Sequence, residues 1–168
     1  MRRLTICIVL AALGPAGCGE PAKPGLSAEP PKPVEMVDSV QLSASPPNAL
    51  NWDDSPGLDG IQVVVQFYQM SQDLPVTVSG TLDFLLCEGM VGAADLAKAQ
   101  VFHMWTYQAY DLPQYLFRSF GLWGYSMRLG WGAHLPTTDT VTLTARYQPP
   151  GGGQPIYARP IIIMMTEK

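Results

Sequence analysis

The chain has 168 residues, of which 47% are hydrophobic and 14% are charged, and its formal net charge is −4. This length and share of apolar residues suit one domain with a single core. The acidic balance argues against a nucleic acid partner and against attachment to anionic lipid headgroups through basic residues.

The first eighteen residues, MRRLTICIVLAALGPAGC, have the pattern of an export signal. Two arginines stand near the start, residues 4–13 form an apolar stretch, and small residues precede Cys18. A helix of that length spans only roughly 15 Å, about half of a hydrocarbon core, so the stretch is too short to remain across a bilayer. We therefore expect residues 1–17 to be a signal peptide that is removed.

Small residues that run directly into a cysteine resemble the lipobox of bacterial lipoproteins. The resemblance implies that the Cys18 thiol receives a diacylglyceryl group and that the new N-terminus is acylated. Pro15 departs from the pattern, because that family usually has Leu there, and an ordinary secretory signal cut nearby is the alternative. Several acyl chains hold a protein at a membrane essentially permanently. The expected location is the cell membrane or outer membrane, facing the periplasm or the exterior.

Cleavage after residue 17 changes the charge and the cysteine count of the remaining chain. It removes two of the ten basic residues and none of the fourteen acidic ones, so the net charge becomes 8 − 14 = −6. Cys7 leaves with the signal and Cys18 carries lipid, so Cys87 stays as a single thiol without a disulfide partner. A Cys18–Cys87 bridge is the alternative if Cys18 is retained unmodified.

Residues 18–33 combine the lipidated Cys18 with a segment rich in Pro, Ala, Glu and Lys that offers little to bury. A Pro-rich segment favours the polyproline II conformation at about 3.1 Å per residue, so it extends up to roughly 45 Å. It is either a spacer across an envelope layer or a disordered linker without a specific role. The folded domain is expected over residues 34–168.

Seven segments of that domain have strand patterns. The clearest, residues 61–69, alternates apolar residues, among them β-branched and aromatic ones, with mainly polar ones. The others are residues 34–43, 76–87, 101–108, 122–131, 138–147 and 156–165. Gly80 indicates a bulge or the close approach of another backbone, and Pro160 indicates an edge strand or a break. Residues 93–100 are a short helical candidate, and residues 111–120 fit either a helical turn or an irregular crossover.

Seven short strands without a repeating strand–helix alternation predict an all-β fold, an antiparallel two-sheet β-sandwich. The segments GLDGIQVVVQF, SGTLDFLL, GLWGYSMRLGW and VTLTARY, together with Trp105, resemble a group of small uncharacterised bacterial lipoproteins with a transthyretin-like or immunoglobulin-like sandwich. The resemblance extends over most of the domain and rests on structural motifs. It implies no activity.

Carboxylates and glycines crowd into the loop before residue 61, with Asp53, Asp54 and Asp59 next to Gly57 and Gly60. Calcium takes about six to eight oxygen ligands from flexible loops, and sandwiches of the C2 type hold it in such loops. The spacing does not match an EF-hand. Turn formation, in which Asp side chains bond the nearby backbone and Gly supplies positive φ, accounts for the same residues. Calcium binding and turn formation both stay open.

Aromatic residues are numerous for a chain of this size. Those of interest are Trp52, Trp105, Trp123, Trp131, Tyr107, Tyr110, Tyr115 and Tyr125. At a period of two in strands such rings are expected in the core. Rings on an exposed surface would instead stack against sugars or bind a partner. Trp52 and Tyr110, both in loops, are the candidates for ligand binding.

No motif typical of catalysis is present in the sequence. His103 and His134 are the only histidines, and zinc-type spacings such as H-E-x-x-H and C-x-x-C are missing. There is no G-x-S-x-G, and Cys87 is expected to be a small buried residue. We therefore expect a non-catalytic lipoprotein that binds an envelope protein or a glycan, or serves a structural role. A carbohydrate-binding or calcium-dependent ligand module is the alternative.

Overall fold

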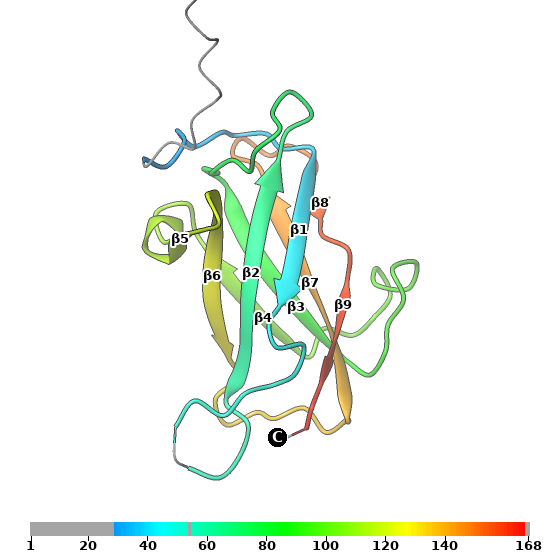
Figure 1. Ribbon diagram of the computed structural model, residues 1–168. Helices are drawn as coiled ribbons and strands as arrows, with labels where there is room; N and C mark the ends of the chain where they lie inside the picture. Colours follow the sequence, from blue (N-terminus) through cyan, green and yellow to red (C-terminus); the bar gives the residue numbers. More distant parts are fainter. Residues whose placement is uncertain (1–28, 54, 167–168) are drawn as a thin grey trace, which may run out of the picture.

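The structure, a computed structural model, describes residues 29–53 and 55–166, which form two antiparallel β-sheets packed against each other (Figure 1). Sheet 1 has the order β1 (Ser39–Ala44), β2 (Gly60–Tyr68), β6 (Leu122–Gly130) and β5 (Leu116–Ser119). Sheet 2 has the order β4 (His103–Tyr107), β3 (Thr81–Glu88) and β7 (Thr140–Gln148), and β7 pairs further with β8 (Ile156–Tyr157) and β9 (Ile161–Met164). The predicted all-β sandwich is confirmed.

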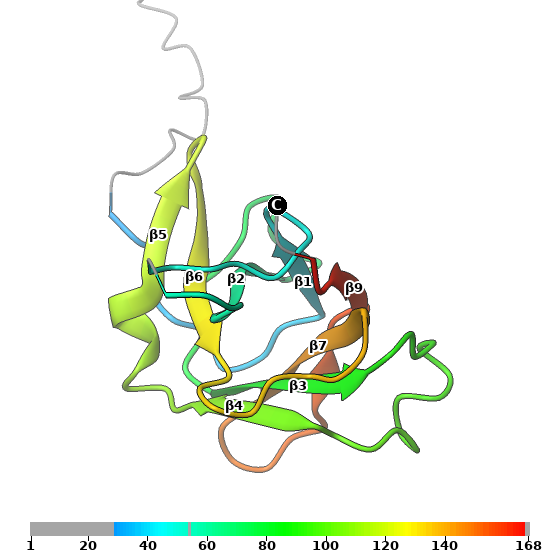
Figure 2. The ribbon, with the colours of Figure 1, turned by 90° about the horizontal axis from the view of Figure 1, so that it is seen from below.

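The order of the strands is that of the immunoglobulin-type sandwich. In that fold the first, second, fifth and fourth strands make one sheet and the third, sixth and seventh make the other. Here β1, β2, β6 and β5 correspond to the first sheet and β3, β7 and β8 with β9 to the second, while β4 is an added edge strand beside β3. Figure 2 shows the two layers, between which the chain crosses three times.

The core consists of the alternate residues that each strand turns toward the opposite sheet. Its buried members include Val63, Val65, Phe67, Leu82, Phe84, Leu86, Met127, Leu129, Leu143 and Ala145. The Phe67 ring meets the Tyr125 and Tyr147 rings edge-on, with centroids 5.7 Å and 5.3 Å apart. Because Phe67 and Tyr125 belong to sheet 1 and Tyr147 to sheet 2, these three rings join the layers.

The described part of the chain has nine strands, two more than the seven that the sequence predicts. One addition is β5, which pairs with β6 in a segment that the sequence left undecided; a short 3-10 helix, η1 (Leu112–Tyr115), precedes it. The other arises at Pro160, which splits the last predicted strand into β8 and β9 because proline has no N–H for the ladder. The predicted break at Pro160 is thereby confirmed.

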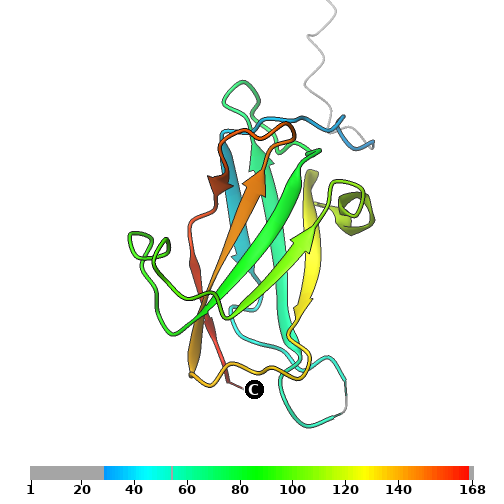
Figure 3. The same ribbon diagram turned by 180° about the vertical axis from the view of Figure 1, so that it is seen from behind.

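Residues 93–100, the short helical candidate, form turns and no continuous helix. Residues 93–98 form successive turns, closed by hydrogen bonds such as those from the Lys98 and Ala99 N–H groups to the Asp95 carbonyl oxygen. A segment of this length is too short to form a stable helix unless it packs an apolar face, and most of these residues are exposed. They lie in the β3–β4 loop, which projects beside sheet 2 (Figure 3).

The end of the expected linker lies against the domain. The Pro31 carbonyl oxygen accepts a hydrogen bond of 2.6 Å from the Thr77 hydroxyl. Val34 forms a parallel bridge with Val78, made by the Val34 N–H to the Thr77 carbonyl oxygen at 2.8 Å and the Ser79 N–H to the Val34 carbonyl oxygen at 3.1 Å. Contacts with the sandwich therefore begin near residue 31, a few residues before the predicted boundary.

Gly80 allows the close approach that the sequence predicts. A Cβ atom at this position would overlap the Gln148 carbonyl oxygen and would lie 2.6 Å from Cε2 of Tyr147. We expect Gly80→Ala to lower the free energy of unfolding by about 2–3 kcal/mol, because neither the backbone nor the buried ring has room to move. Urea unfolding measures the change. Gly92→Ala, where the nearest atom is 3.7 Å away, is the control; equal losses in both variants would contradict the packing argument.

Candidate functional site

Asp53 and Asp59, the described carboxylates of the loop at residues 51–59, accept hydrogen bonds from the backbone of the same loop. Asp59 accepts the Trp52 N–H at 2.5 Å and Asp53 accepts the Ser55 N–H at 2.7 Å. Asn51 accepts the Asp53 N–H at 3.0 Å and donates to the Ser55 carbonyl oxygen at 2.6 Å. These are side-chain-closed turns of the kind that Asp and Asn favour.

Calcium binding by this loop stays a prediction. Asp54 lies outside the described residues, and within residues 29–53 and 55–166 no group of three or more His, Cys, Asp or Glu side chains is placed to hold a metal ion. We expect the melting temperature in millimolar calcium to equal that in chelator, because Asp53 and Asp59 each already bind an N–H group. A higher melting temperature in calcium than in chelator would instead show that the ion binds the folded state.

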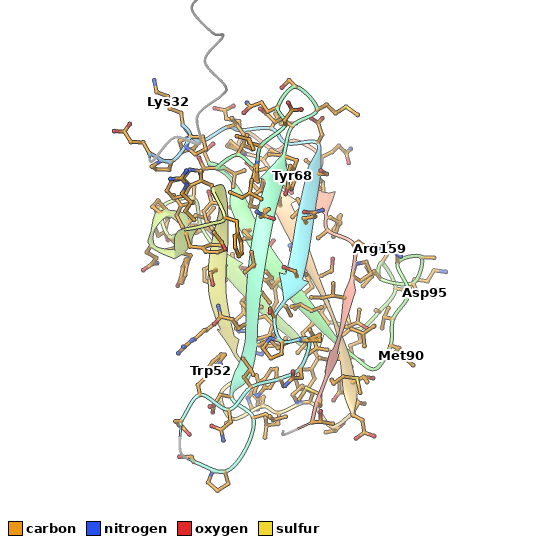
Figure 4. All side chains as sticks on the ribbon, viewed as in Figure 1. Lys32, Trp52, Tyr68, Met90, Asp95 and Arg159 are labelled. Atoms are coloured by element: carbon orange, nitrogen blue, oxygen red, sulfur yellow. The ribbon has the colours of Figure 1, made fainter. Side chains whose placement is uncertain are left out.

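Trp52 is half-buried and covers the lower end of sheet 1 (Figure 4). Its ring packs against the backbone at Gly60 and Gly130, and the Arg128 guanidinium lies 5.5 Å from the ring centroid. One face of the ring is therefore occupied. Tyr110, the other predicted contact, is exposed and precedes η1. The two residues lie in different loops, Trp52 between β1 and β2 and Tyr110 between β4 and η1.

Of the remaining aromatic residues, some are buried in the core and others are half-buried at its edge. Trp131 and Tyr125 are buried as predicted, and the Trp131 indole N–H donates to the Leu58 carbonyl oxygen at 2.7 Å. Trp105 is half-buried, and its indole N–H donates to the Gly130 carbonyl oxygen at 2.8 Å. Burial raises the pKa of Tyr107 to about 12, and the neighbouring Tyr115 adds to the rise.

The nucleophile and base candidates are not assembled. The His103 ring packs against Trp105 with centroids 4.3 Å apart and ring planes tilted by 46°, while His134 lies in the loop after β6. Cys87 is buried on the outer side of sheet 2, beside a cleft of about 290 Å³ under the β3–β4 loop. The Thr142 hydroxyl holds that loop, since it donates to the Gly89 carbonyl oxygen at 2.7 Å and accepts the Val91 N–H at 2.8 Å.

Cys87 should react slowly with thiol reagents in the folded protein. Burial raises the pKa of this thiol, so its reactive thiolate is scarce at pH 8 and becomes more abundant only as the pH rises toward the higher value. We expect alkylation at pH 8 to be slow when folded and fast in urea, as read by mass spectrometry of the Cys87 peptide. Equal rates in the two states would show that the thiol is accessible.

The outward side chains of sheet 1 form a mainly polar surface. This surface, the polar face, consists of Ser39, Gln41, Ser43, Gln62, Val64, Gln66, Tyr68, Phe117, Ser119, Leu122, Ser126 and Arg128. No other element covers it in Figure 1. The four strands contain no acidic residue, and their only charged residues are Arg118 and Arg128, although the chain has fourteen acidic residues.

Hydrogen bonds hold the amides of the polar face in place. Gln62 donates to the Ser126 hydroxyl at 2.7 Å and accepts from Arg128 Nε at 3.3 Å. Gln66 accepts from the Tyr68 hydroxyl at 3.2 Å. A Cβ on Gly124 would lie 3.1 Å from the Gln66 side chain, so the missing side chain leaves room for the amide to lie flat.

Fold and surface together define an all-β sandwich with one organised polar face. No family model, curated protein or solved structure that was searched matches the chain. In the part of the chain that the structure describes, no helix is long and apolar enough to cross a membrane.

Proposed function

We propose that this protein is an exported lipoprotein, held at a membrane by lipid on Cys18, whose sandwich is a non-catalytic binding module. The signal-like residues 1–17 and the cysteine that follows them support the anchor, although they lie outside the described residues. The lack of a G-x-S-x-G motif and of zinc-type histidine or cysteine spacings in the sequence supports a module without catalysis. The polar face of sheet 1 is the observation that carries the binding role.

The chemistry of the polar face suits an uncharged polysaccharide of the cell envelope. Amide and hydroxyl side chains both donate and accept hydrogen bonds, as sugar hydroxyls do. The amides of Gln62 and Gln66 are held by their neighbours, so less conformational entropy is lost when a ligand binds. The absence of acidic groups from these strands leaves the face free of the negative charge found elsewhere on the chain.

A single substitution at the centre of the polar face tests this role. Val64 lies between Ser43 and Ser126 in the register of the sheet. We expect Val64→Arg to reduce binding to purified envelope polysaccharide by at least about tenfold, because a long charged side chain would cover the neighbouring hydroxyls. Met104→Arg, on the outer side of the edge strand β4, should bind as the parent does.

Three outcomes would count against the polysaccharide. The parent protein could fail to bind any envelope polysaccharide, the two arginine variants could lose binding equally, or an envelope protein could be captured through the polar face in its place. The first two would remove the assigned role of the face, and the third would change the class of its ligand.

A further inference from the structure

Phe120 stands at the tip of the β5–β6 hairpin in a conformation that aromatic residues rarely adopt. Ser119 pairs with Leu122, so Phe120 and Gly121 alone form the turn, with φ angles of 49° and 83°. A two-residue turn with both residues at positive φ favours Asn-Gly. Phe120 is also 99% exposed.

Phe120 is therefore unfavourable in two separate ways. A bulky side chain at positive φ strains the backbone, and a fully exposed ring gives up the burial that usually stabilises Phe. A single exposed apolar residue needs no explanation, but a residue that is poor both for its turn and for its exposure does. Such conflicts between local rules concentrate at functional positions.

Other exposed apolar side chains lie at the same end of the sandwich. Met70, in the β2–β3 connection, is 94% exposed, and Leu74 follows in the same connection. Val65 pairs with Tyr125 in the antiparallel β2–β6 ladder, so both the residues that follow β2 and those that precede β6 belong to this end of the sheet. Phe120 lies in the β5–β6 hairpin, and Met70 and Leu74 lie in the β2–β3 connection, which is a separate loop of this end. We call Met70, Leu74 and Phe120 the apolar tip.

The chain enters the sandwich beside this tip. The first described residues run past β5 at the upper end of the molecule in Figure 1, where Lys32 is labelled in Figure 4. A mainly apolar groove of about 230 Å³ lies there, and its lining includes Pro30, Pro31, Pro33, Pro113 and Leu116. Ten residues separate Glu29 from Cys18, and a chain of that length reaches at most roughly 40 Å.

We propose that the apolar tip inserts into the surface of the bilayer to which Cys18 is anchored. The inference rests on the proposed lipid anchor. A single Phe side chain contributes too little to hold a free protein at a membrane, but the tether keeps the tip close to the bilayer and makes weak contact effective. The acidic chain disfavours attraction to anionic headgroups, so the apolar contact should also form on uncharged phosphatidylcholine.

Fluorescence quenching by brominated lipid tests the contact. The lipid-bearing full chain is placed on phosphatidylcholine vesicles as Phe120→Trp and, for comparison, as Met90→Trp. Met90 is 78% exposed in the β3–β4 loop, at the opposite side from Lys32 in Figure 4. We expect brominated acyl chains to remove most of the fluorescence that Phe120→Trp adds to the parent signal and none of that added by Met90→Trp.

Flotation of the vesicles separates the failure of this inference from the failure of the anchor. Protein that floats and shows quenching at position 120 alone supports the inference. If the protein floats while positions 120 and 90 remain equally unquenched, the inference is overturned and the lipid anchor stands. If the protein does not float, both are overturned.

A second variant tests whether Phe120 is kept at a cost to the fold. Phe120→Asn restores the Asn-Gly pair that the turn favours, so we expect its melting temperature to rise above that of the parent. A lower melting temperature would mean that Phe120 serves the fold itself, and the inference would be overturned.

Discussion

Replacing Phe67 by alanine is expected to lower the free energy of unfolding by about 3–5 kcal/mol, the largest loss of any change considered for this protein. The ring is fully buried and meets Tyr125 in its own sheet and Tyr147 in the other, so its removal opens a cavity between the layers. Chemical denaturation measures the loss. Phe67→Leu, which keeps more of the volume, should lose less and remains measurable if the alanine variant fails to fold.

Phe120→Ala is the matched control for this prediction. It makes the same substitution at a fully exposed ring. The backbone strain at position 120 is similar with Phe or Ala, because either residue has to adopt the same positive φ. Its stability should stay within about 0.5 kcal/mol of the parent. Similar losses at positions 67 and 120 would contradict the assignment of Phe67 to the core.

Replacing Arg146 by methionine is expected to cost about 2–4 kcal/mol, because it leaves the buried Asp83 carboxylate without its cation. The two residues are directly opposite on β3 and β7. Arg146 Nε and Nη2 lie 3.0 Å and 2.8 Å from Asp83 Oδ2, and the Thr106 hydroxyl donates to Oδ1 at 2.7 Å. The Asp83 side chain is only 7% exposed, so water cannot replace the lost guanidinium well.

The double variant Asp83→Leu with Arg146→Met separates the value of the pair from the penalty of an isolated charge. We expect it to be more stable than Arg146→Met alone, because it removes the buried carboxylate as well. The measurement is a double-mutant cycle by urea unfolding. If the losses in free energy of unfolding are additive, the two groups are not coupled. That result would contradict the coupling that we infer from their short contacts.

The parts of the fold that local chemistry determines could be predicted from the sequence. The alternation in β2 fixes which residues are buried, Gly80 marks a close approach of backbones, and Pro160 marks a break. Each follows from a property of one residue or one short repeat. The order of the strands depends on pairing between distant segments, so the sequence supported the class of sandwich but not its topology.

The parts that were missed depend on tertiary contacts. The strand β5 forms because it pairs with β6 across Phe120-Gly121, a turn without the Asn-Gly signal of such hairpins. Residues 93–98 have helical composition but no partner surface, so they form turns. The spacing of residues could not show that Asp53 and Asp59 would close their own loop.

The polar face could also not be predicted from the sequence pattern alone. The alternation of Gln62 and Gln66 in β2 signals an outward polar row, but Ser126 and Arg128 join that row only through the register with β6. The place of Trp52 in a loop predicts that its ring is exposed and available for a contact. Its packing on Gly60 and Gly130 depends on two glycines that meet only after β2 and β6 pair.

The mass of the mature N-terminal peptide tests the central claim, which is that lipid on one cysteine holds this sandwich at a membrane. The account predicts a peptide that begins at Cys18 and carries a diacylglyceryl group and an N-linked acyl chain, in protein recovered from the membrane fraction. A peptide that still contains residues 1–17, or one with an unmodified Cys18, would contradict it.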